Sequence, residues 1–143
     1  MLLHNKLVWY DDYASGIEII DKQHQQLFEG FNNFYSEINQ GHFDKEVIDK
    51  FIEVLDYYTS THFETEEKMM LKENFSDYEE HKKRHDFFKA LYIEIRDNKF
   101  FRHSAAHIFA INLATTAAEW WNSHIVTYDK ELASFLKNLN KDY

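Results

Sequence analysis

The chain has 143 residues, enough for one domain whose core needs no disulfide bonds. It contains no Pro, no Cys and only 3 Gly, with 44% hydrophobic and 29% charged residues, which excludes collagen-like, disordered and disulfide-stapled proteins. The net charge of -9 disfavours nucleic acid as a partner. Residues 1–9 lack a signal-peptide pattern and no apolar run reaches about 18 residues, so we expect a soluble cytoplasmic protein without membrane insertion.

Hydrophobic residues recur at helical spacing in four long segments. The first predicted helix covers residues 17–38 and is broken at Gly41. The second reaches residue 70, with Asp44 as a candidate N-cap. Asp21 also has the residue type of an N-cap, and we expect it to cap the first helix.

Ser76 and Glu79 have the spacing of a capping box and predict a third helix that continues to residue 95. Ser104 is a candidate N-cap for a fourth helix over residues 106–124, and a short amphipathic segment follows over residues 132–139. Four helices with short connections indicate an all-α, up-down-up-down antiparallel four-helix bundle with an N-terminal arm and a short C-terminal helix. We expect residues 1–143 to form a single domain.

The core-facing stripes of these helices carry an unusual number of polar residues. One buried histidine is ordinary, but a buried ionised glutamate is costly unless it is paired. A metal-free bundle with hydrogen-bonded core histidines would leave several polar groups uncompensated. The residues concerned are His24, His62, Glu66, His81, His85 and His124.

Antiparallel register brings these six residues to one level. Around the first turn, His24 lies about 18 residues back and His62 about 20 forward, or about 27 and 30 Å along a helix. Around the second turn, Glu66 and His85 lie about 9 and 10 residues away. Asp129 follows His124 by five residues, so it joins this layer only if the helix ends or unwinds between them.

Five imidazoles and two carboxylates exceed the three or four ligands of one zinc ion and suit two metals that share bridging carboxylates. Imidazole-rich coordination favours iron, copper, zinc or nickel over calcium and magnesium. No histidine is preceded by Glu at the Glu-x-x-His spacing of ferritin-like di-iron bundles; only Asp21 precedes His24 at that distance. His-Glu-x-x-His is absent as well, which disfavours a zincin protease.

Four segments, in this order, closely resemble those of hemerythrins, and specifically of single-domain bacterial hemerythrins. They are DKQH at 21–24, HFETEEKMM at 62–70, HKKRHDFF at 81–88 and WWNSHIVTYD at 120–129. The resemblance extends over nearly the whole chain and implies a four-helix bundle with an oxo- or hydroxo-bridged, non-haem di-iron centre. By resemblance, one iron is held by His81, His85 and His124, the other by His24 and His62, and both by Glu66 and Asp129.

The resemblance also implies the function. In the family, dioxygen binds reversibly as hydroperoxide at the two-histidine iron, and no side chain acts as a catalyst. We therefore expect a binding protein for oxygen carriage, storage or delivery, with an unidentified protein acceptor as the candidate partner, rather than an enzyme. The alternatives are an oxygen or redox sensor, and a di-iron oxidase or peroxide- or nitric-oxide-handling enzyme. The fixed ligand count and missing ferritin motif disfavour metal storage.

The oxygen pocket implied by the resemblance contains Phe63, Trp120, Trp121 and Ile125. The family usually has Leu where this chain has Trp121, three residues before His124. This departure predicts a narrower or differently gated pocket with altered oxygen affinity or autoxidation. The alternative is that the indole only fills core volume, and the same holds for Phe63 and Ile125.

The remaining histidines are expected to lie outside the site. His103 and His107 form another pair four residues apart, but they sit at the far end of the fourth helix, about 25 Å from the predicted cluster. A solvated helix face explains them. His4 and His42 lie in the N-terminal arm and in a loop, where we expect surface positions.

Overall fold

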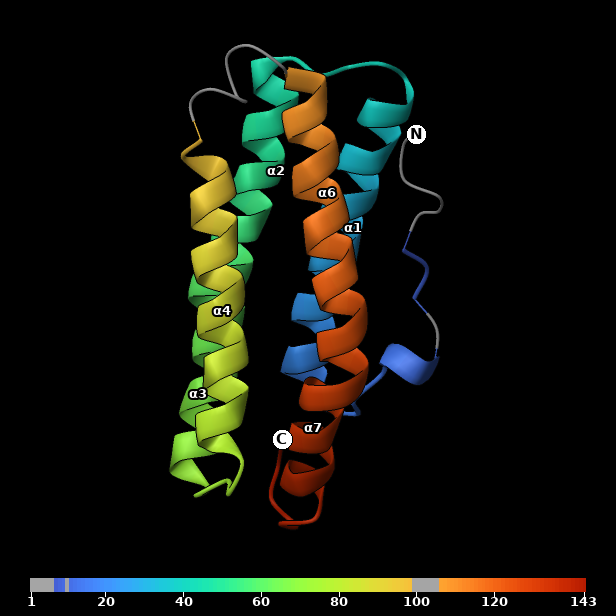
Figure 1. Cartoon of the computed structure of the whole chain (residues 1–143). Coiled ribbons are helices and arrows are strands. Elements are labelled where there is room, and N and C mark those ends of the chain that lie inside the picture. The colour runs from blue at the N-terminus through green and yellow to red at the C-terminus, as the bar shows by residue number, and fades with distance from the viewer. Residues whose placement is uncertain (1–6, 10, 99–105) are drawn as a thin grey trace.

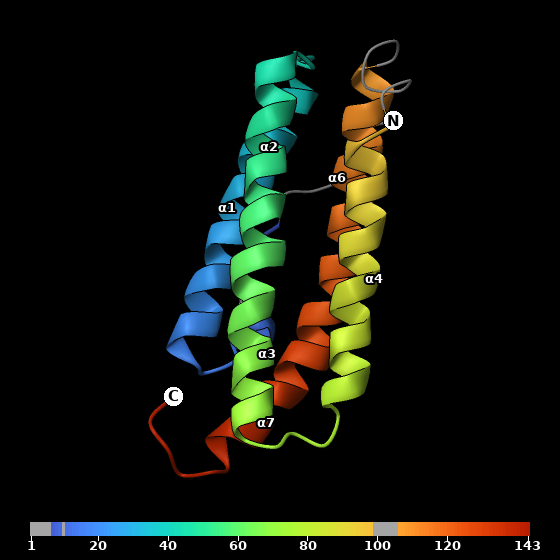
Figure 2. The ribbon, with the colours of Figure 1, turned by 90° about the vertical axis from the view of Figure 1, so that its left-hand side faces the viewer.

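The computed structural model describes residues 7–9, 11–98 and 106–143, which form four helical rods (Figures 1 and 2). The rods run alternately up and down, which confirms the predicted all-α antiparallel bundle. In chain order the elements are η1 (Asp11–Tyr13), α1 (Glu18–Asn39), α2 (Lys45–Tyr57), η2 (Tyr58–His62), α3 (Phe63–Lys72), α4 (Tyr78–Arg96), α6 (Ala106–His124), η3 (Ile125–Asp129) and α7 (Lys130–Lys137). α2, η2 and α3 are continuous and make one rod; α6, η3 and α7 follow one another in the same way.

The bounds of α1 agree with the predicted helix over 17–38 to within one residue, but the predicted N-cap is wrong. The helix begins at Glu18, so Asp21 lies inside its first turn and is not the N-cap. Its carboxylate instead accepts hydrogen bonds from the backbone N–H groups of Ser15 (2.8 Å) and Gly16 (3.1 Å) and from the Ser15 hydroxyl (2.7 Å). A carboxylate in the first turn is also favoured by the helix dipole. Asp21 therefore fixes the entry of the chain into α1 from inside the helix.

Of the N-caps predicted for α2 and α4, the first is confirmed and the second is wrong. Asp44 is the N-cap of α2, as predicted, although its side chain makes no capping hydrogen bond. The capping box at Ser76 is wrong, because α4 begins at Tyr78 with Asp77 as its N-cap. The backbone N–H of Phe75 is still bonded to the carbonyl of Met70, so the turn after α3 extends to the residue directly before Ser76. The predicted N-cap Ser104 lies outside the described residues.

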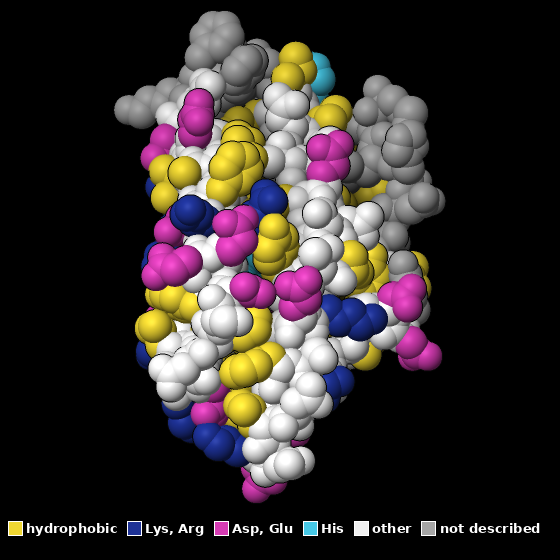
Figure 3. All heavy atoms as spheres, turned by 60° about the horizontal axis from the view of Figure 1, so that its bottom comes forward, with side chains coloured by type: hydrophobic (Ala, Val, Ile, Leu, Met, Phe, Trp, Pro, Cys, Tyr) yellow, Lys and Arg dark blue, Asp and Glu magenta, His cyan; other side chains and the backbone are white. Residues whose placement is uncertain are grey.

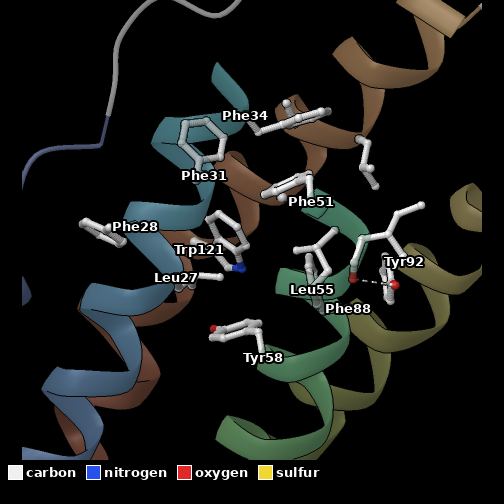
Figure 4. Packing of buried hydrophobic residues seen from close by; sticks show 14 of the residues in the cluster. Leu27, Phe28, Phe31, Phe34, Phe51, Leu55, Tyr58, Phe88, Tyr92 and Trp121 are labelled. Carbon is white, nitrogen blue, oxygen red and sulfur yellow. Dashed lines mark hydrogen bonds between the residues drawn. The ribbon is translucent and has the colours of Figure 1, made fainter. Parts of the chain in front are cut away.

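The apolar interior has two parts. The larger cluster fills the bundle from the α1–α2 turn down to the middle, and its large aromatic members include Phe31, Phe51, Tyr58, Phe88 and Trp121 (Figure 4). The smaller cluster fills the opposite end, where α7 packs against the start of α1 and the end of α3. Its buried members are Ile17, Ile20, Met70, Phe75, Leu132, Ala133 and Leu136.

The described residues of the N-terminal arm, 7–9 and 11–13, lie along the outside of the bundle, beside α1 and α6 (Figure 1). The backbone of Leu7 exchanges two hydrogen bonds with the side chain of Asn32 on α1, at 2.8 and 2.7 Å. The hydroxyl of Tyr13 donates to Asn122 on α6 at 2.9 Å. The arm is thus tied to two rods.

Charged side chains of both signs are spread over the face at the α7 end, with hydrophobic side chains between them (Figure 3). None of the helices in the described part of the chain is both long enough and apolar enough to cross a membrane.

Candidate metal centre

The structure brings all seven predicted ligand residues into one layer between the two apolar clusters. Each is at most 2% exposed. They come from all four rods: His24 from α1, His62 and Glu66 from η2 and α3, His81 and His85 from α4, and His124 and Asp129 from α6 and η3.

Two short π-helical segments, η2 and η3, position ligands in this layer. η3 runs over Ile125–Asp129 and begins directly after His124. A π-helix has more residues per turn than an α-helix, so residues five apart lie nearly above one another. This brings Oδ1 of Asp129 to 3.0 Å from Nε2 of His124 and supplies the unwinding that their spacing required. η2, over Tyr58–His62, places His62 at its last position.

One set of donor atoms contains three imidazoles. Nε2 of His81 and Nε2 of His124 each lie 3.0 Å from Oδ1 of Asp129. Oε1 of Glu66 lies 3.4 Å from Nε2 of His81 and 3.2 Å from Nε2 of His85. All five residues thus offer donor atoms to one small volume.

A second set contains two imidazoles and the same two carboxylates. Nε2 of His24 lies 2.9 Å from Nε2 of His62 and 2.9 Å from Oδ2 of Asp129. Nε2 of His62 lies 3.5 Å from Oε1 of Glu66. Asp129 therefore turns one oxygen toward each set, and Oε1 of Glu66 contacts both sets. Both carboxylates could therefore be shared by two ions, one in each set.

The donor atoms fit a pair of transition-metal ions. Two ligand atoms at right angles around an ion, each about 2.1 Å from it, are about 3 Å apart, which matches the distances observed here. Several buried atoms of the cluster make no well-aligned hydrogen bond to any described residue, although some of them lie close to other ligand atoms: both oxygens of Glu66, Oδ2 of Asp129 and Nε2 of His85 and His124. Such atoms are destabilising when buried alone, and cations would satisfy them.

The two carboxylates are held in the ionised form. Burial raises the pKa of Asp129, but the neighbouring imidazoles, above all that of His124, outweigh burial and hold it well below its ordinary value. Burial and the charge of Asp129 raise the pKa of Glu66, yet three imidazoles lower it to about 2. Two negative charges are thus fixed in the layer.

The surroundings shift the pKa values of the five imidazoles in different directions. Burial lowers the pKa of all five, and for His62 and His124 burial prevails. For His24, His81 and His85 the hydrogen bonds and charges of the carboxylates prevail, raising the pKa of His81 to about 10. Without metal, protons on these imidazoles balance the carboxylates; metal ions would take the place of those protons.

Two further side chains orient ligand imidazoles and were not predicted. Nδ1 of His62 lies 2.7 Å from Oε1 of Gln23, and Nδ1 of His85 lies 2.8 Å from Oε2 of Glu67. Donation from Nδ1 fixes the tautomer that presents Nε2 as a ligand. Gln23 is the residue before His24, and Glu67 is the residue after Glu66, so adjacency to a ligand was the one signal in the sequence.

Aromatic rings cover the three-imidazole set. Phe63 stacks on His85 with centroids 3.8 Å apart, and Trp120 stacks on His124 at 4.1 Å. Trp121 is fully buried and contacts Tyr58 edge to face, while Ile125 is 2% exposed. All four residues predicted for the oxygen pocket therefore lie beside the ligand cluster or one turn from it.

The remaining described histidines lie outside the cluster. His107 is exposed on α6. His42 is exposed in the loop after α1, where its Nδ1 contacts Glu37 at 2.6 Å. His4 and His103 lie outside the described residues.

The fold and the site together define a four-helix-bundle protein with a buried histidine and carboxylate cluster for metal. The family described as Hemerythrin HHE cation binding domain matches residues 15–136. The chain belongs to the hemerythrin family.

Curated relatives agree with this assignment. A bacteriohemerythrin of Stenotrophomonas maltophilia is 29% identical over 131 residues, which cover 92% of this chain and 82% of the relative. A bacteriohemerythrin of Pseudomonas aeruginosa is 33% identical over 119 residues, covering 83% and 74%. The myohemerythrin of Sipunculus nudus is 31% identical over 81 residues, covering 57% and 61%. No solved structure matches the chain significantly.

Proposed function

We propose that the chain binds dioxygen reversibly at a non-haem di-iron centre held by the seven-residue cluster, and that it is not an enzyme. The observation that carries the proposal is the unequal division of five imidazoles into sets of three and two that share both carboxylates. An ion at the two-imidazole set has fewer protein ligands and therefore room for a small ligand. Membership of the hemerythrins, a family of oxygen-binding proteins, supports the proposal.

A pair of ferrous ions would supply the redox-active site at which dioxygen is taken up. The ligand set suits reversible uptake because five neutral imidazoles and two carboxylates provide only two negative charges. More carboxylates would favour a higher iron valence. Glu66 and Asp129 would hold the two ions together, and Gln23 and Glu67 would keep His62 and His85 in position.

Burial supports release of dioxygen without further reaction. The ligand residues are at most 2% exposed, and Phe63 and Trp120 lie flat against two of the imidazoles. A dry site limits the entry of protons and the loss of reduced oxygen. The affinity for dioxygen would then decide among carriage, storage and delivery to an acceptor.

The test is the optical spectrum of iron-loaded protein through one cycle of anaerobic reduction, admission of oxygen and its removal. Reversible binding predicts ligand-to-iron bands that appear with oxygen and vanish without it, with two iron atoms per chain. If oxygen converts the protein directly to a stable ferric state whose spectrum does not change when oxygen is removed, the proposal is contradicted and an oxidase or a redox sensor is indicated.

Two variants make this test specific to the cluster. His24→Ala removes one of the two imidazoles at the open side and should abolish the reversible bands. His42→Ala removes an exposed histidine in a loop and should leave them unchanged. Equal spectra for the two variants would show that His24 is not needed for oxygen binding and would contradict the proposed site.

A further inference from the structure

One layer of side chains lies a helical turn from the ligand cluster, on the side of the larger apolar core. It contains Leu27, Tyr58, Phe88 and Trp121, one residue from each rod (Figure 4). Each stands three or four residues from a ligand histidine along its own rod, so it lies next to that ligand on the same helical face. This layer is the roof of the site.

Two polar atoms in this roof have no partner. The hydroxyl of Tyr58 and Nε1 of Trp121 are both buried and make no hydrogen bond to any described residue. The two side chains are 1% and 0% exposed. Buried donors in native proteins are normally paired, and a lone one calls for an acceptor that is absent from the protein itself.

Tyr58 lies against the two-imidazole set, and Trp121 lies against Tyr58. The ring of Tyr58 stacks on the imidazole of His62, with centroids 5.0 Å apart and planes 12° apart. Trp121 meets Tyr58 edge to face at 5.7 Å, and its indole nitrogen is turned toward Tyr58 (Figure 4). The Tyr58 hydroxyl is turned toward α1 and Leu27, which stands one turn above His24.

A pocket between α1 and α2 reaches the same place. It has a volume of about 260 Å³, and Gln23, Leu27 and Tyr58 are among its lining residues. Gln23 also contacts the imidazole of His62. Three lining residues of this pocket therefore either belong to the roof or contact an imidazole of the two-imidazole set.

We propose that Tyr58 and Trp121 are the hydrogen-bond donors for a small di- or triatomic ligand bound at the two-imidazole side of the centre. This inference rests on the proposed function. The ligand class is dioxygen and small anions such as azide, whose outer atom can accept a hydrogen bond. The roof thus holds the ligand by specific donors as well as by its shape.

The test uses azide and the ferric, iron-loaded protein, with affinity followed by the azide-to-iron absorption band. Tyr58→Phe removes only the hydroxyl and should weaken azide binding about three- to tenfold, the effect of one hydrogen bond. Trp121→Phe should weaken it as well, and the double variant more than either. The matched control is Tyr92→Phe, which removes the hydroxyl of another buried tyrosine, one that donates to Asp56 at 2.5 Å.

A second measurement uses metal-free protein and urea unfolding. A hydroxyl without a partner contributes no hydrogen bond, so Tyr58→Phe should leave the unfolding midpoint unchanged or raise it. Tyr92→Phe should lower the midpoint because it breaks the bond to Asp56. A lowered midpoint for Tyr58→Phe would show that its hydroxyl already has a partner, such as a buried water, and would overturn the inference.

Failure of the inference is separable from failure of the proposed function. If the native protein binds two iron atoms and azide, and Tyr58→Phe binds azide with equal affinity, then the donor role is wrong and the di-iron site remains. If the native protein binds no iron, the proposed function itself fails, and the donor role fails with it.

Discussion

Asp129 and His124 are five residues apart, yet Oδ1 of the first lies 3.0 Å from Nε2 of the second because the backbone between them is π-helical. The same carboxylate turns its other oxygen to Nε2 of His24 on α1. One side chain therefore links the last rod to both ligand sets. The effects of removing its charge follow directly from this position.

Asp129→Asn should lower the iron content of the protein from two atoms per chain to one or fewer. The amide keeps the size of the side chain but cannot bridge two cations with two charged oxygens. Iron per chain, measured after loading and desalting, checks this. The control is Asp86→Asn on α4, where an exposed carboxylate pairs with Lys82 and contacts no ligand. Full iron loading of the Asp129 variant would rule out a bridging role.

Trp121→Leu should raise both the rate of oxygen release and the rate of autoxidation. Trp121 is completely buried in the roof, and the smaller side chain opens space above the two-imidazole set and removes one donor. The variant should also be less stable by about 2–4 kcal/mol, since a large core side chain is lost. Stopped-flow and slow absorbance traces of the oxygenated protein measure the two rates. Unchanged rates would mean that the indole only fills volume.

In metal-free protein, stability should rise with pH on the acid side. The pKa of Glu66 in the folded state is about 2, below its ordinary 4.5, so its contribution is present above pH 4.5 and lost as pH falls toward 2. Asp129 acts in the same direction. His62 and His124, with pKa values lowered by burial, extend the rise toward their ordinary 6.5, because the unfolded chain binds their protons more readily.

At alkaline pH, the stability of the same metal-free protein should fall as pH rises. The pKa of His81 is raised from 6.5 to about 10, so its contribution is present below pH 6.5 and lost as pH rises through 10. His24 and His85 act in the same direction. Urea unfolding across pH should therefore show a maximum near pH 6.5. Iron-loaded protein should lack the alkaline fall, because its imidazoles are already neutral ligands; identical pH profiles would contradict the assignment of these residues.

Gly30→Ala should destabilise the bundle by about 1–3 kcal/mol. Gly30 lies inside α1, and a Cβ added there would lie 2.6 and 2.7 Å from the two methyl groups of Val54 on α2. Alanine is otherwise favoured over glycine in a helix, so a loss of stability can come only from this contact. The double variant Gly30→Ala/Val54→Ala should recover stability in urea unfolding. No recovery would locate the strain elsewhere.

The bundle and the meeting of six of the seven candidate ligands in one layer could be predicted from spacing alone. Repeats of apolar residues locate helices, and antiparallel register brings residues at equal distances from a turn to one level, as for His24 and His62. Asp129 could not be placed from α-helical spacing. Its five-residue distance from His124 showed that the helix must end or unwind between them, and the resemblance to hemerythrins gave its role. The structure identifies that change as a π-helical segment.

The helix starts and the supporting residues were harder to predict. Asp21 has the residue type of an N-cap, but Ile17 is the N-cap of α1, four residues earlier, and the Asp21 carboxylate accepts hydrogen bonds from Ser15 and Gly16. Gln23 and Glu67 follow no periodic pattern, because their role depends on which imidazole lies across the bundle. Local composition carries no information about such cross-helix partners.

The polar ligand layer has a mechanical consequence for the molecule. It separates the larger apolar cluster from the smaller one beneath α7, and all four rods cross it. With cations in place, seven ligand side chains would tie the rods together at this level, and we expect the two ends of the bundle to unfold as one unit. Without cations, we expect the end beneath α7 to open before the larger core does. We therefore expect the cooperativity of unfolding to depend on bound metal as well as on apolar packing.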